Sequence, residues 1–159
     1  YWTATPVGNF CGKERKEVDL APGGNFSVSK KLVEDLGGFD ETFNIGAALY
    51  EESEFFLRLK KNGGLVFFDP AAKLIHLAAP SGGCRTPDHW QYIFSMAHNR
   101  SLLIRRYLKW YHQPTAWLRL GILVFSYVKL WKRLALVEAA FLGIEKALFQ
   151  NEKSKLKLY

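Results

Sequence analysis

Four glycine pairs divide the first half of the chain into short pieces, and they limit its possible folds more than any other feature. The pairs lie at residues 23–24, 37–38, 63–64 and 82–83. Glycine readily adopts the left-handed backbone conformation that ends helices and permits tight turns. The intervals between the pairs therefore predict brief helices and strands, and longer helices follow only after residue 87.

Hydrophobic periodicity and capping residues predict which element occupies each interval. The predicted elements are an extended or irregular lead-in over 1–22, a short helix capped by Ser27 or Ser29 and ending at Leu36, a helix over 50–62, strands over 65–68 and 73–77, a polar loop over 80–85, a helix over 88–111, and helical structure from about 115 to 150. Pro114 is expected to break the pattern between the last two.

Basic charge is concentrated in the last third of the chain. Residues 1–98 contain 10 Lys or Arg and 12 Asp or Glu, whereas residues 99–159 contain 12 and 3. This asymmetry indicates an anionic partner for the last third, either lipid or nucleic acid. The basic residues alternate with long aliphatic side chains, which favours an anionic membrane surface and argues against nucleic acid.

No feature of the sequence indicates secretion. The chain opens on Tyr1 and Trp2 without a signal-peptide pattern. Its two cysteines, Cys11 and Cys84, lack metal-binding spacing and are expected to be ordinary thiols of a reducing compartment. The sequence therefore predicts a cytoplasmic protein, and its abrupt beginning suggests a fragment.

Three acids, Glu51, Glu52 and Glu54, stand at the predicted start of the second helix. Carboxylates there accept hydrogen bonds from free backbone N–H groups and are favoured by the helix dipole, so capping is one interpretation. The other is that one carboxylate is a general base, which must lie within hydrogen-bond reach of a substrate hydroxyl. Adjacent acids point in different directions, so Glu51 and Glu52 can bind different groups.

Three other polar residues each have a structural and a functional interpretation, and a fourth has a structural one. His76 is either a structural histidine or a ligand for a Mn²⁺-type metal ion. Asn25 lies either in a simple turn or in a ligand site, where its side-chain amide would form hydrogen bonds with hydroxyls of the ligand. Arg85 is either a solvated loop charge or a diphosphate contact. Arg58, four residues after Glu54, is expected to form an ion pair on the helix surface.

Taken in order, these motifs resemble the second half of the family 2 glycosyltransferase domain, which has the GT-A fold. The motifs are Gly-Gly-Asn-x-Ser-x-x-Lys at 23–30, Gly-Gly-Phe-Asp-Glu-x-Phe at 37–43, Glu-Glu-x-Glu-Phe-x-x-Arg-x-x-x-x-Gly at 51–63, and the stretch from Phe68-Asp69-Pro70 to His76. The Ser81-Gly82-Gly83-x-Arg85 loop and Asn99-Arg100 are similar to the rhamnosyltransferase-type branch. The resemblance implies an α/β fold, with the acceptor-side half of a GT-A domain over 1–112 and amphipathic helices over 113–159.

This resemblance implies an inverting enzyme that transfers a sugar from a nucleotide-diphosphate donor to a hydroxyl of a glycan or lipid-linked acceptor. Glu52 occupies the catalytic-base position, where members of the family usually have Asp. Glu51 is the neighbouring acid that helps to hold the donor sugar. Gly24 and Asn25 fall where the family lines the sugar pocket.

The sequence lacks the motif by which GT-A enzymes hold the metal ion and the nucleotide. No Asp-x-Asp occurs in the 159 residues, and no alternation of strands and helices precedes Gly23. By the resemblance, the chain is a fragment that is inactive alone. Most ligands of a divalent metal, Mn or Mg, are expected in the missing N-terminal half, with His76 as a further ligand and Arg85 as a diphosphate contact.

Residues 116–149 are strongly apolar but interrupted by charge. The longest uncharged run, 120–128, has nine residues, whereas a membrane-spanning helix needs about 20. The spacing places a basic face opposite an apolar face, which is typical of a helix lying in the interface of a bilayer. The basic face consists of Arg119, Ser126, Lys129 and Arg133, and the apolar face of Leu120, Leu123, Val124, Tyr127, Trp131 and Leu134.

Two interpretations of this segment remain open. In the first, the helix is peripheral on the inner face of the cell membrane, attracted by anionic lipid. In the second, it packs on its own domain. A rival to the enzyme hypothesis is a non-catalytic basic membrane-surface module, whose acids only cap helices.

Overall fold

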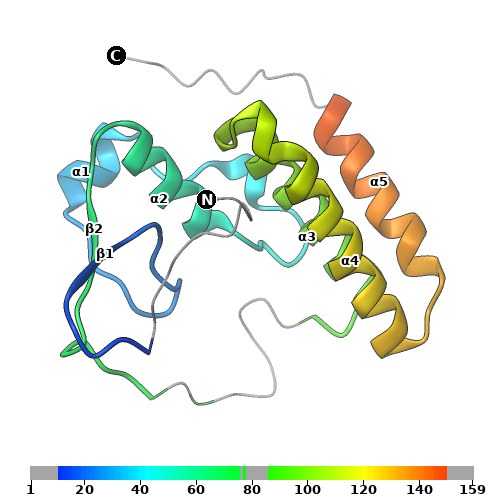
Figure 1. Cartoon of the computed structure of the whole chain (residues 1–159), viewed down its shortest axis with the longest axis horizontal. Helices are drawn as coiled ribbons and strands as arrows, with labels where there is room; N and C mark the ends of the chain where they lie inside the picture. Colours follow the sequence, from blue (N-terminus) through cyan, green and yellow to red (C-terminus); the bar gives the residue numbers. More distant parts are fainter. Residues whose placement is uncertain (1–10, 76, 78–85, 150–159) are drawn as a thin grey trace. The chain divides into compact units, whose positions relative to one another are not determined.

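The computed structural model describes residues 11–75, 77 and 86–149 (Figure 1). Its elements, in chain order, are β1 (Lys16–Val18), α1 (Lys30–Asp35), η1 (Glu41–Phe43), α2 (Glu51–Lys61), β2 (Val66–Phe68), α3 (His89–Tyr107), η2 (Trp110–His112), α4 (Gln113–Trp131) and α5 (Ala135–Phe149). The described part is mainly helical and contains one small sheet. The expected α/β class therefore holds only in the loose sense that both kinds of element are present.

The described residues form two compact units. Residues 11–41, 51–75 and 77 form one, called here the sheet unit, and residues 42–50 and 86–149 form the other, called the helical unit. Each is described by itself. The division into segments 1–112 and 113–159 stays a prediction.

The sheet unit is built on α2 and a two-stranded sheet. Strands β1 and β2 are antiparallel, with Lys16 opposite Phe68 and Val18 opposite Val66. The apolar side of α2 packs on this sheet and completes a small core. The buried residues of that core are Val18, Phe55, Phe56, Leu59 and Val66.

The predicted stops and caps of the sheet unit are confirmed. Ser29, one of the two predicted caps, accepts a hydrogen bond from the Leu32 N–H at 3.2 Å and begins α1. Gly37 and Gly38 adopt φ of 79° and 78°, and Gly63 adopts 82° after α2. These left-handed values are the reason that glycine is needed there.

One prediction about strands was incomplete and another was wrong. The lead-in that was expected to be extended or irregular contains β1, whose pairing with β2 depends on residues about 50 positions away. The described residues 73–75 and 77 form no strand, although their apolar run predicted one. Leu74, Ile75 and Leu77 are exposed, so no described neighbour supplies the burial that such a strand needs.

The helical unit is a set of three helices, α3, α4 and α5, that lie side by side (Figure 1). α5 presents small residues to α3: Ala139, Ala140, Gly143 and Ala147 are all buried. A side chain at Gly143 would place its Cβ 2.4 Å from the Phe94 carbonyl oxygen. The two backbones therefore approach too closely for any larger residue.

The helical structure predicted from about 115 to 150 consists of two helices, α4 and α5. α4 begins at Gln113 with Pro114 in its first turn, where proline is favourable because its missing N–H has no helical partner. The chain reverses at Lys132, whose φ of 53° is left-handed, and α5 follows. In the part of the chain described, none of the helices combines the length and the hydrophobicity needed to cross a bilayer.

The apolar face of α4 predicted for a bilayer packs inside the helical unit. Leu120 and Val124 are buried in its core, and Tyr127 and Trp131 are partly buried against that core. Periodicity located this face correctly, but the face covers α3 and α5, which sequence alone could not reveal. Leu134 is the exception, because it is exposed. Membrane association stays a prediction, and it requires a surface other than this packed face of α4.

Candidate active site

The predicted site begins with the acids at the start of α2. Glu51 and Glu52 are partly buried, whereas Glu54 is completely buried. They occupy the first turn of α2, where backbone N–H groups lack helical partners. The three carboxylates therefore differ in surroundings, although the sequence presents them as one cluster.

Glu52 lies directly against the first glycine of the 23–24 pair. A Cβ added to Gly23 would lie 3.4 Å from Glu52 Cδ and 3.6 Å from Oε2. No atom lies within 4 Å of the corresponding position on Gly24. The structure thus brings the glycine turn and the Glu52 carboxylate together and leaves Gly24 open. Gly23, whose Cβ position adjoins the carboxylate, was not among the predicted sugar-binding residues, Gly24 and Asn25.

The pKa of the Glu51 carboxyl is raised above its ordinary value. Burial is the larger cause, and the negative charge of Glu52 is the second. Both effects disfavour the ionised form. A carboxylate that only caps a helix is stabilised as an anion by N–H groups and the dipole, which would lower its pKa. The raised pKa therefore distinguishes Glu51 from a simple cap.

This pKa predicts how replacing Glu51 affects stability. Since folding raises the pKa above 4.5, the native state binds a proton more tightly than the unfolded state, and stability falls as pH rises above that value. Glu51→Gln cannot ionise, so its melting temperature should exceed that of the unmodified protein at neutral pH. The gain should disappear below about pH 4, where both states are protonated.

Thermal denaturation at several pH values measures this difference. Glu34→Gln is a matched control, because the Glu34 side chain is 63% exposed and its removal should change little. If Glu51→Gln melts below the unmodified protein at neutral pH, the carboxylate is a stabilising cap.

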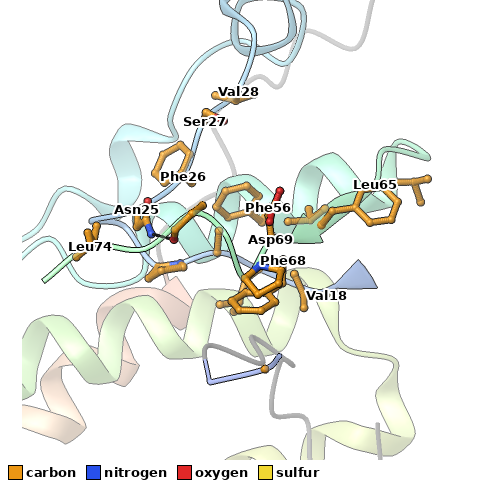
Figure 2. Close-up of a pocket in the computed structure, with 18 of the residues that line it drawn as sticks. Val18, Asn25, Phe26, Ser27, Val28, Phe56, Leu65, Phe68, Asp69 and Leu74 are labelled. Carbon is orange, nitrogen blue, oxygen red and sulfur yellow. Dashed lines mark hydrogen bonds between the residues drawn. The ribbon is translucent and has the colours of Figure 1, made fainter. Parts of the chain in front are cut away.

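Asn25 is tied to the segment that follows β2. Its Nδ2 donates a hydrogen bond to the Ala72 carbonyl oxygen at 2.8 Å. Asn25 also lines a cavity of about 1020 Å³ whose walls are mainly apolar, including Val18, Phe26, Phe56 and Phe68 (Figure 2). Glu51 and Glu52 do not line this cavity. The turn at 23–25 therefore has Glu52 beside its first residue and the cavity beside its last.

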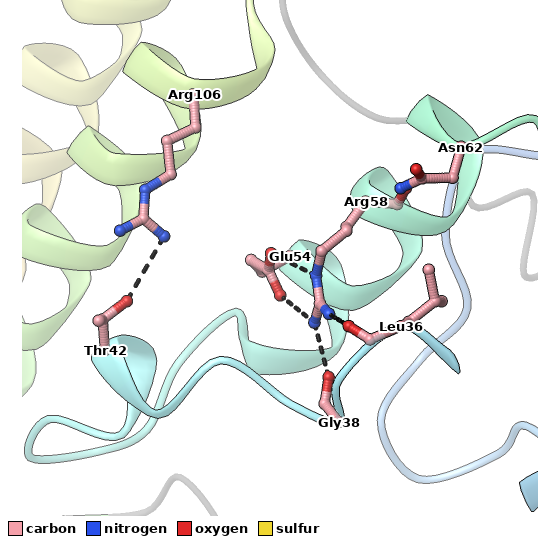
Figure 3. Close-up of polar contacts among 7 residues, drawn as sticks. All are labelled: Leu36, Gly38, Thr42, Glu54, Arg58, Asn62 and Arg106. Carbon is pink, nitrogen blue, oxygen red and sulfur yellow. Dashed lines mark hydrogen bonds and ion pairs between the residues drawn. The ribbon is translucent and has the colours of Figure 1, made fainter. Parts of the chain in front are cut away.

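Arg58 and Glu54 form an ion pair, but it is not the helix-surface pair that was predicted. Their side chains are only 7% and 1% exposed. Arg58 Nε and Nη2 each lie 2.9 Å from an oxygen of Glu54. The guanidinium also donates to the carbonyl oxygens of Leu36 and Gly38 (Figure 3). The pair thus fastens α2 to the turn that ends α1.

A strained segment in the helical unit ends next to Glu51 in the sequence. Ala48 and Tyr50 adopt φ of 48° and 70°, which side chains rarely tolerate, at a cost of about 1–3 kcal/mol each. Asn99 Nδ2 donates to the carbonyl oxygens of Phe43 and Leu49 at 2.8 and 2.7 Å. These two hydrogen bonds from Asn99 hold the segment in its strained conformation.

Asn99 is itself oriented by its neighbour. His98 Nδ1 lies 2.7 Å from Asn99 Oδ1, and both residues are completely buried. An amide oxygen only accepts, so the ring nitrogen carries the proton. The sequence marked Asn99 only by resemblance. The position of this polar pair between the apolar residues Met96, Ala97 and Leu102 of α3 was the available signal that it has buried partners.

Two predicted site residues, His76 and Arg85, lie outside the residues that the structure describes. Across residues 11–75, 77 and 86–149, no group of three or more His, Cys, Asp or Glu side chains comes together as a metal site would require. No protein-family model matches the chain, and no curated protein or solved structure matches it either.

Proposed function

We propose that this chain is the acceptor-side part of an inverting, nucleotide-sugar-dependent glycosyltransferase of family 2 with a GT-A fold. The observation that carries the proposal is the pair of carboxylates, Glu51 and Glu52, at the start of α2, with Glu52 beside Gly23 and open space at Gly24. The order and spacing of the motifs support the same family.

The surroundings of the two carboxylates suit a division of roles. Adjacent acids whose environments differ are a common arrangement for acid–base chemistry. Glu52 lies beside Gly23, and the open space at the neighbouring Gly24 is where the proposal places the acceptor hydroxyl. Glu51, with its raised pKa, is suited to hydrogen-bond a hydroxyl of the donor sugar. Asn25, tied to Ala72, keeps the turn in place.

The proposed reaction is a single displacement. The Glu52 carboxylate removes the proton from the acceptor hydroxyl as its oxygen attacks the anomeric carbon. The bond from that carbon to the diphosphate oxygen breaks, and the nucleoside diphosphate leaves with the electron pair. Attack from the opposite side inverts the anomeric configuration. A divalent metal, when bound, supplies charge neutralisation of this leaving group, and the described residues alone do not gather its ligands.

A non-catalytic role for the acids is the competing function. In that role Glu51 and Glu52 would only cap α2, and the protein would act through its basic helices. The raised pKa of Glu51 argues against capping as its sole role, because capping interactions favour the anion.

Acceptor-dependent release of nucleoside diphosphate tests the proposal. The protein that contains this chain together with its nucleotide-binding half would be incubated with UDP-, GDP- and dTDP-sugars, a divalent metal, and simple or lipid-linked saccharides. One donor should give release that depends on the acceptor, while residues 1–159 alone should give none. Release by residues 1–159 alone would contradict the assignment of the nucleotide site to the other half.

A further inference from the structure

Helix α4 has a second apolar face, which is exposed. Leu118, Ile122 and Phe125 lie four and three residues apart, which places them on one side of the helix. They are 66%, 57% and 68% exposed. Leu130 and Leu134, at the turn between α4 and α5, are 68% and 81% exposed.

The row formed by Leu118, Ile122 and Phe125 is separate from the core of the helical unit. The core uses another side of α4, where Leu120, Val124 and Val128 are buried. A surface helix of a globular protein ordinarily has one apolar stripe, which faces its core. Contiguous exposed apolar side chains beyond that stripe indicate a surface that binds another molecule or a membrane.

The charges around the row indicate what covers it. Residues 89–137 contain no Asp or Glu. Lys129 follows Phe125 by four residues and continues the row, and Lys132 and Arg133 lie exposed at the turn. A second copy of the chain would bring the same positive charges to the contact, whereas an anionic surface would neutralise them.

We propose that the outer face of α4, together with the α4–α5 turn, is a surface that binds anionic phospholipid bilayers. Leu118, Ile122 and Phe125 enter the interface between headgroups and acyl chains, and Lys129, Lys132 and Arg133 meet the headgroup phosphates. This surface is on a different side of α4 from the apolar face that the sequence predicted. It does not depend on the proposed sugar transfer.

Co-sedimentation of the whole chain with vesicles tests the proposal. The protein should bind phosphatidylcholine vesicles that contain phosphatidylglycerol, and binding should weaken as salt rises. It should bind pure phosphatidylcholine vesicles much less. Ile122→Gln with Phe125→Gln should reduce binding at least about tenfold, because the buried apolar area is lost. Lys129→Glu with Arg133→Glu should do the same, since each basic residue contributes about fivefold.

A matched control removes equally exposed apolar side chains from the sheet unit. Ile75 and Leu77 are 86% and 81% exposed, so Ile75→Gln with Leu77→Gln should bind vesicles like the unmodified chain. Circular dichroism checks that each variant keeps its helices, which is expected because the replaced side chains are exposed. Sedimentation velocity without vesicles measures self-association.

Three results would overturn the proposal. One is failure of the unmodified, folded chain to bind anionic vesicles. Another is an equal loss of binding in the control variant with Ile75→Gln and Leu77→Gln, which would indicate non-specific hydrophobic adsorption. The third is a dimer that the Ile122→Gln and Phe125→Gln variant abolishes, because the face would then be covered by a second copy.

Discussion

Replacing Glu52 by Gln is expected to lower the rate of sugar transfer by at least about 100-fold in the protein that carries both halves of the site. The amide keeps the size of the side chain and its contact with Gly23, but it cannot accept the proton of the acceptor hydroxyl. Donor affinity, measured by calorimetry with the nucleotide sugar, should change little.

Two variants make the Glu52 result specific. Glu52→Asp introduces the residue that family 2 glycosyltransferases, the proposed family, usually have at this position, so it should keep most of the activity. Glu34→Gln removes an exposed carboxylate of the same unit and should leave the rate unchanged. Near-normal turnover in Glu52→Gln would remove this residue from the mechanism.

Removing Glu54 is expected to have the largest effect on stability. Glu54→Ala leaves the Arg58 guanidinium in a buried position without its carboxylate. Breaking a buried pair in this way costs about 3–5 kcal/mol of unfolding free energy. The loss should appear in urea denaturation as a lower midpoint with a similar slope.

The chain contains its own control for this prediction. Lys31 and Asp35 have the same spacing of four residues and an N–O distance of 2.7 Å, but their side chains are 82% and 56% exposed. Asp35→Ala should cost at most about 1 kcal/mol, because water screens the pair. Similar losses from both variants would mean that burial does not set the strength of the Glu54–Arg58 pair.

The sequence predicted features that depend on local chemistry. The Ser29 cap, the left-handed glycines after α1 and α2, and the bounds of α2 follow from interactions within a few residues. The resemblance assigned roles to Glu52, Gly24 and Asn25 but did not predict that Glu52 lies beside Gly23.

Features that depend on distant partners could not be predicted in the same way. Glu54 and Arg58 have the spacing of a surface pair, but they are buried, and Arg58 donates hydrogen bonds to the distant carbonyl oxygens of Leu36 and Gly38. α4 is apolar on two sides, so periodicity located one apolar face correctly without revealing that it packs inward. The reversal of the chain direction at Lys132 is not marked by a glycine or proline at that position, so the sequence did not predict it.

The anomeric configuration of the transferred sugar tests the central claim most directly. An α-linked nucleotide sugar would be supplied to the protein with both halves, and proton NMR would determine the linkage in the product. The account predicts a β-linkage, because an acceptor activated by Glu52 attacks from the side opposite the diphosphate. An α-linked product would contradict it.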